Sequence, residues 1–107
     1  WAYKDKPEMI EGISSAYISA GNRNGIMTFP VGLAFQRSQK ENPDIELFTP
    51  DKRHPSKAGT YLMAAVIYAS LYKVSPIGNT YDYGLGKIIQ SKLQTTAWET
   101  LSYYKNN

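Results

Sequence analysis

Residues 51–62, DKRHPSKAGTYL, carry the only histidine of the chain and run directly into its most apolar segment. Pro55 stiffens the backbone after this histidine, and Ser56 is a favoured N-cap residue. A helix is therefore predicted to begin near Lys57, with His54 held just before its N-terminus.

The spacing of Asp51 and His54 indicates a proton-handling pair. In a tight Asp-x-x-His turn, the carboxylate can accept a hydrogen bond from the imidazole Nδ1–H, which fixes the tautomer and leaves Nε2 as a base. The alternative is a surface or helix-capping histidine with Asp51 capping the same turn, because such pairs also occur in structural networks. A metal site is not expected, since no further His or Cys is present as a ligand.

The segment after this turn, residues 61–72, is apolar on nearly every side, with Ser70 as its one clearly polar residue. Such a helix is predicted to be buried on several faces. It is far shorter than the ~20 residues that a membrane span requires, so we expect no membrane span. The rest of a 107-residue chain offers too little apolar surface to cover this helix, which predicts a missing packing partner.

Residues 26–30, IMTFP, form a short apolar run that follows Gly25. This run comes after an amphipathic helical pattern over residues 9–20, and it predicts a buried parallel strand. One strand cannot make a sheet, so its partners must come from another segment or another chain. The expected fold class is therefore α/β, mostly helical in this chain with one parallel strand.

Two more helices are predicted over residues 31–40 and 85–101, where apolar side chains recur every three or four positions. The loop before the second of these helices carries Tyr81 and Tyr83. Both tyrosines are candidates for lining a substrate cleft, and an ordinary tyrosine-rich loop explains them equally well.

Composition limits the classes of function. A chain of 107 residues, 42% hydrophobic and 20% charged, is expected to form one small globular domain over residues 1–107. Zero cysteines exclude a disulfide framework and a thiol nucleophile, and they leave the cellular compartment open. The net charge of +3 comes from basic residues interleaved with acidic ones, so no nucleic-acid partner is expected.

The string Asp-x-x-His-Pro-Ser-x-x-Gly-x-Tyr-Leu at residues 51–62 resembles the final block of the SGNH (GDSL-type) serine hydrolases. The resemblance covers roughly residues 7–104 and continues in three further stretches, which are PVGLAF at 30–35, the apolar helix at 64–72 closed by Ser75-Pro76, and LQTTAW at 93–98.

The resemblance implies that Asp51 and His54 are the catalytic acid and base of a serine esterase. It also implies that residues 1–107 are the C-terminal part of a flavodoxin-like, three-layer α/β/α domain. The expected substrate is a small-molecule ester, such as an acetylated carbohydrate or a lipid, and no cofactor is implied.

Two departures from the family pattern concern the nucleophile and the oxyanion hole. The chain contains no Gly-Asp-Ser block, and residues 21–24, GNRN, do not match the family's Gly-x-Asn-Asp. The resemblance therefore implies that an N-terminal half of the same domain, absent here, supplies the serine. Alone, this chain is predicted to be inactive.

A second hypothesis assigns the chain no catalysis. It would then be an inactive remnant, or a helical interaction module that docks on a sheet-bearing partner through residues 26–29 and the helix at 61–72.

Overall fold

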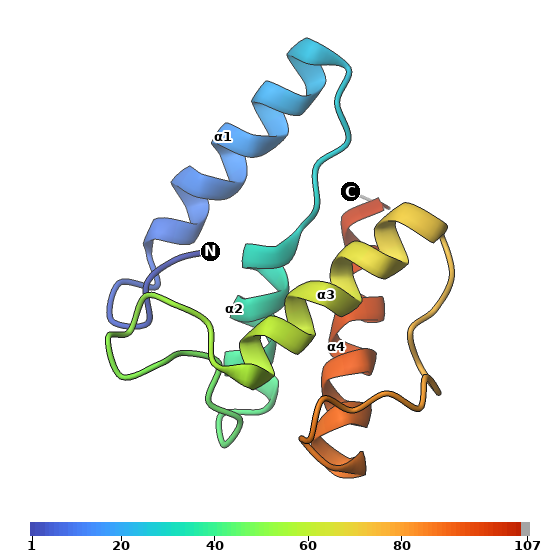
Figure 1. Ribbon diagram of the computed structural model, residues 1–107. Helices are drawn as coiled ribbons and strands as arrows, with labels where there is room; N and C mark the ends of the chain where they lie inside the picture. The colour runs from blue at the N-terminus through green and yellow to red at the C-terminus, as the bar shows by residue number, and fades with distance from the viewer. Residues whose placement is uncertain (106–107) are drawn as a thin grey trace.

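The computed structural model describes residues 1–105, which form four helices (Figure 1). Their bounds are α1 Met9–Asn24, α2 Val31–Glu41, α3 Lys57–Tyr72 and α4 Lys87–Lys105. Within residues 1–105 there is no strand, and the single β-type contact is an isolated antiparallel bridge between Phe48 and Pro55. The predicted α/β fold class is therefore wrong for this chain, which is all-helical.

The predicted parallel strand over residues 26–30 is a connector between α1 and α2 instead (Figure 1). Most of its side chains are not buried, since Ile26 is 66% and Met27 53% exposed, and of these five residues only Pro30 is buried. A run of β-prone residues becomes a strand only when a second strand supplies the hydrogen-bonding ladder, and residues 1–105 contain no such second strand.

The helix ends follow local sequence signals. Ser56 caps α3, because its Oγ accepts a hydrogen bond from the backbone N–H of Gly59 at 3.2 Å. This confirms the predicted start of the helix at Lys57. At the C-terminal end of α1, Gly25 adopts a left-handed conformation with φ of 63°, which glycine tolerates without steric cost.

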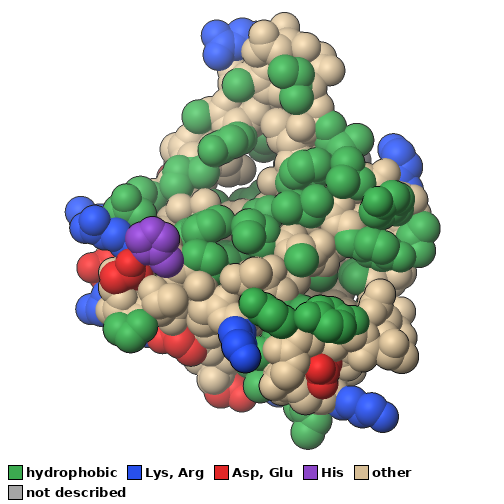
Figure 2. Space-filling model, in the orientation of Figure 1, with side chains coloured by type: hydrophobic (Ala, Val, Ile, Leu, Met, Phe, Trp, Pro, Cys, Tyr) green, Lys and Arg blue, Asp and Glu red, His purple; other side chains and the backbone are tan. Residues whose placement is uncertain are grey.

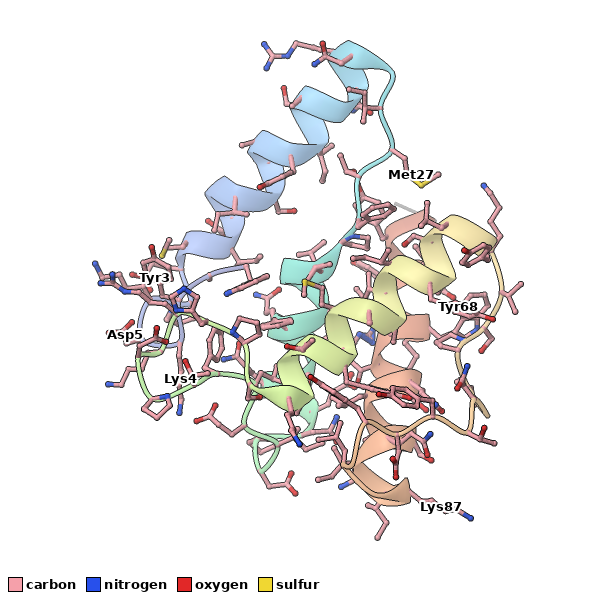
Figure 3. All side chains as sticks on the ribbon, viewed as in Figure 1. Tyr3, Lys4, Asp5, Met27, Tyr68 and Lys87 are labelled. Carbon is pink, nitrogen blue, oxygen red and sulfur yellow. The ribbon has the colours of Figure 1, made fainter. Side chains whose placement is uncertain are left out.

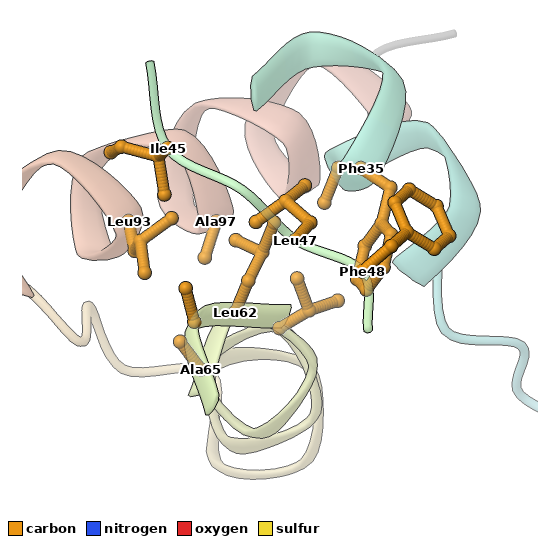
Figure 4. Packing of buried hydrophobic residues seen from close by; sticks show 11 residues of the cluster. Phe35, Ile45, Leu47, Phe48, Leu62, Ala65, Leu93 and Ala97 are labelled. Carbon is orange, nitrogen blue, oxygen red and sulfur yellow. The ribbon is translucent and has the colours of Figure 1, made fainter. Parts of the chain in front are cut away.

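The core lies where α3 packs against α2 and α4, with the segment at 45–48 between them. Phe35, Leu47, Leu62 and Leu93 are all at least 98% buried and meet there (Figure 4). Packing therefore holds residues 47 and 48 firmly, directly before the turn that carries Asp51.

Two parts of the molecule pack less completely than the apolar pattern predicted. Among the helices, α1 packs only against α2 and projects away from the rest (Figure 1). In α3, the last turn presents Leu71 and Tyr72 to the outside, 52% and 66% exposed. The expectation that α3 is buried on several faces holds for its N-terminal turns but not for its C-terminal end.

Membrane crossing was not expected, and the structure agrees as far as it describes the chain. In residues 1–105, every helix is too short or too polar to traverse a bilayer.

Gly59 is the point of closest approach between α3 and the segment that precedes the turn. A Cβ at this position would lie 2.2 Å from the backbone oxygen of Leu47, which also accepts a hydrogen bond from Ser56 N–H at 2.8 Å. Because neither backbone can move freely, Gly59→Ala should lower the free energy of unfolding by about 3 kcal/mol, the upper part of the usual range for overpacking.

The matched control is Gly12→Ala, at the end of the first turn of α1. An added Cβ there has no neighbour within 4 Å, so this change should raise stability by about 0.5–1 kcal/mol through helix propensity alone. Urea unfolding followed by circular dichroism at 222 nm measures both. Equal effects of the two substitutions would contradict the close approach.

Candidate functional site

The turn at residues 49–55 joins the core segment to α3 and is closed by its own backbone. Thr49 N–H donates to the His54 carbonyl at 2.8 Å, and Lys52 N–H donates to the Thr49 carbonyl at 2.9 Å. Lys52 has a left-handed backbone with φ of 64°, an uncommon conformation for lysine. The turn is therefore a defined structure although residues 51–54 are all exposed.

Asp51 is the hub of this turn. Its Oδ1 accepts hydrogen bonds from Thr49 Oγ1 at 2.7 Å, from Arg53 N–H at 2.9 Å and from His54 N–H at 3.0 Å. These donors stabilise the ionised carboxylate. The backbone N–H of His54, its imidazole, the Arg53 N–H and the Thr49 hydroxyl, in falling order of effect, hold the pKa of Asp51 far below its ordinary value.

The second carboxylate oxygen of Asp51 contacts the imidazole. Oδ2 of Asp51 and Nδ1 of His54 form a hydrogen bond, so the structure brings together the two residues that the sequence singled out. Nε2 of His54 has no hydrogen-bond partner within residues 1–105, and the side chain is 77% exposed. This arrangement is a carboxylate that orients an imidazole with one nitrogen free to accept a proton.

His54 lies at the border of two kinds of surface. In Figure 2 it stands between charged side chains on one side and the hydrophobic side chains that cover the middle of this face on the other.

Tyr81 and Tyr83 lie on the loop between α3 and α4, apart from the Asp51–His54 pair. Their rings stack with centroids 6.3 Å apart, and they border a cleft of about 330 Å³ that Tyr61 and Tyr68 of α3 also line. Within residues 1–105, no hydrogen bond or ring contact joins either tyrosine to Asp51 or His54. Their links to the N-terminal turns of α3 are the Tyr61 hydroxyl, which donates to the Tyr81 carbonyl at 2.8 Å, and the Lys57 ammonium, 5.6 Å from the Tyr83 ring centroid.

Two glutamines of α4 that the sequence patterns did not single out, Gln90 and Gln94, hold this tyrosine loop in place. Gln94 Nε2 donates to the Tyr61 hydroxyl at 3.0 Å and to the Asn79 carbonyl at 2.9 Å, and Gln90 Nε2 donates to the Tyr81 carbonyl at 3.0 Å. Both glutamines are more than 90% buried. Their spacing of four on the face that carries Leu93 was the signal, because a buried polar side chain requires a partner.

The described part of the chain brings no three His, Cys, Asp or Glu side chains together in a way that could hold a metal ion.

Comparisons of the chain with protein-family models, curated proteins and solved structures found no match.

The low pKa of Asp51 predicts how this carboxylate ionises, and how it contributes to stability, at low pH. Because folding lowers this pKa, the contribution of Asp51 to stability is complete above its ordinary value of 3.8 and is lost as pH falls through the folded-state value. The ¹³Cγ signal of Asp51 should therefore show an ionised carboxylate well below pH 3.8.

His54→Ala should raise the pKa of Asp51 only part of the way towards 3.8. The imidazole donor is lost, but the backbone N–H of residue 54, which has the larger effect, remains. A full return to 3.8 in this variant would mean that the imidazole alone, and not the turn, stabilises the carboxylate.

Proposed function

We propose that this chain is the C-terminal segment of a serine esterase of the SGNH type, in which His54 is the general base and Asp51 orients it. The observation that carries the proposal is the hydrogen bond between His54 Nδ1 and Asp51 Oδ2, together with an exposed Nε2. This is the arrangement in which an imidazole accepts a proton from an alcohol while a carboxylate stabilises the imidazolium.

The proposed reaction is acyl transfer in two steps. Nε2 of His54 takes the proton of a serine hydroxyl, the serine oxygen attacks the ester carbonyl, and His54 returns the proton to the departing alkoxide. Water then repeats the sequence on the acyl-serine and releases the carboxylic acid. The serine and the oxyanion-hole donors belong to another polypeptide segment.

Ser56 is the serine nearest to His54 in the sequence, and its hydroxyl is already used. Its Oγ donates to the Glu46 carbonyl at 2.7 Å and accepts from Gly59 N–H at 3.2 Å. Removing this proton would break the link to Glu46, and an attack by Oγ would withdraw the acceptor that caps α3. The proposed nucleophile therefore comes from another segment, and we expect no turnover by the chain alone.

The surface available to such a segment lies around the connector between α1 and α2. A cleft of about 480 Å³ opens there, lined by side chains of α1 such as Ile13 and Tyr17 and by Met27 and Phe29. Within residues 1–105, the backbone N–H groups of Met27 and Thr28 have no hydrogen-bond partner. Exposed apolar side chains next to free backbone donors are what a strand of another sheet can pair with.

The second candidate function is a non-catalytic interaction module, and the same surface favours it. Hydrophobic side chains gather over the middle of the face in Figure 2, and Ile26, Met27, Leu71 and Tyr72 are each more than half exposed. Apolar surface of this kind marks a protein interaction site whether or not chemistry follows.

Replacing the base tests the catalytic proposal. In a polypeptide that joins this chain to the serine-bearing segment, His54→Ala should lower kcat/KM for p-nitrophenyl acetate by about 10²–10⁴-fold, the usual contribution of a general base. Asp82→Asn, which changes a carboxylate on the tyrosine loop, should leave the rate unaltered. Unchanged turnover in His54→Ala would remove the esterase proposal and leave the interaction module.

Charging the connector tests the docking surface for both candidates. Met27→Glu places a carboxylate on an exposed apolar side chain and should weaken association with the sheet-bearing segment by at least about tenfold, because a desolvated charge opposes burial. Met27→Leu keeps the apolar character and is the control. Isothermal titration calorimetry measures both, and equal affinities would move the docking site away from this connector.

A further inference from the structure

Residues 1–4 lie across the turn that carries Asp51 and His54, although about fifty residues separate them in the sequence (Figure 3). Trp1 Nε1–H donates to the Arg53 carbonyl at 2.8 Å. Lys4 N–H donates to the Lys52 carbonyl at 3.0 Å. These two carbonyls belong to the peptide groups directly before His54, so the contacts act on the backbone from which the imidazole projects.

Side chains of the same segment add two further contacts. The Arg53 guanidinium lies 4.9 Å from the centroid of the Tyr3 ring, within cation–π range. The Lys4 ammonium pairs with the Glu46 carboxylate, and this hydrogen bond lowers the pKa of Glu46. Glu46 lies within the core segment at 45–48, so residues 1–4 contact both the turn and the segment that precedes it.

The segment is itself anchored in the core through Trp1. Its ring stacks on Phe35 with centroids 5.2 Å apart and planes 14° apart, and Phe35 meets Phe48 edge to face at 5.7 Å. Phe35 and Phe48 are at least 97% buried. The indole therefore contacts the rigid part of the molecule with its face and the turn with its N–H.

The turn needs such support because its own side chains do not reach the core. Residues 51–54 are all exposed, and the left-handed backbone of Lys52 is a conformation that lysine does not favour by itself. A small rotation of the Lys52–Arg53 peptide groups would swing Nε2 of His54 away from a fixed target. Misplacement of a catalytic group by about 1 Å can cost about 10²-fold in rate.

We propose that residues 1–4 form a clamp on the turn and that Trp1 is a positioning residue for His54. The catalytic role of this clamp rests on the proposed function. Within residues 1–105 no hydrogen bond or ring contact joins Trp1 to the imidazole, and Trp1 acts through the Arg53 carbonyl.

The test is Trp1→Phe, which keeps an aromatic ring for Phe35 and removes the N–H donor together with one ring of the indole. The control is Trp98→Phe, the same substitution at the half-buried tryptophan of α4. Because His54 is the only histidine, its imidazole signals are unambiguous. In Trp1→Phe, amide hydrogen exchange at Arg53 and His54 and solvent exchange of the Nδ1 proton should accelerate roughly 2–10-fold, the factor that one net hydrogen bond supplies.

The urea midpoint separates positioning from loss of fold. It should shift no more in Trp1→Phe than in Trp98→Phe, while only Trp1→Phe changes the exchange rates at residues 53 and 54. Tyr3→Leu is a second variant, which removes the ring beneath Arg53 and should have a smaller effect of the same sign. Exchange rates at Arg53 and His54 that match those of Trp98→Phe would overturn the clamp.

Activity then distinguishes the clamp from the esterase proposal. In the serine-containing polypeptide, Trp1→Phe should lower kcat with little change in KM. Accelerated exchange without any esterase activity in the parent polypeptide would retain the clamp and overturn the esterase. The opposite result is that His54→Ala abolishes activity while Trp1→Phe changes neither activity nor the exchange rates. That result would retain the esterase and overturn the clamp.

Discussion

The carboxylate of Asp51 is the interaction on which the candidate site depends. One oxygen gathers a hydroxyl and two backbone N–H groups and so closes the turn, while the other meets the imidazole of His54. Because the same group does both, the conformation of the turn and the orientation of the base are not independent. The exposed turn is also joined to the core on both sides, through Phe48 before it and the cap of α3 after it.

Asp51 does cap a tight turn, as the structural interpretation of this residue predicts. Three of its four hydrogen bonds would exist with any residue at position 54 that has an N–H. What capping does not explain is an imidazole aligned on the remaining oxygen with its second nitrogen in solvent. That alignment is why the esterase proposal takes precedence over a purely structural role.

The side of the molecule formed by α1, the connector at 26–30 and the end of α3 is incompletely packed, as expected if a partner covers it. In the described part of the chain, α2 is the one helix that α1 packs against. The connector at 26–30 has free backbone donors, and apolar side chains at the end of α3 face outward. The other side is different, because buried glutamines of α4 satisfy the tyrosine loop from within. The two sides therefore differ in how completely the chain satisfies its own polar and apolar groups.

The sequence by itself determined the local features. Ser56 and Pro55 predicted where α3 begins, and the Asp-x-x-His spacing predicted the contact between Asp51 and His54, because capping and tight turns depend on residues within a few positions of one another. The strand expected at 26–30 was wrong for the opposite reason, since a strand exists only through a neighbour that lies elsewhere. Tertiary structure alone decided that Trp1 supports the turn at Arg53, because a contact across about fifty residues depends on how α2 and α3 pack and leaves no pattern in the local sequence.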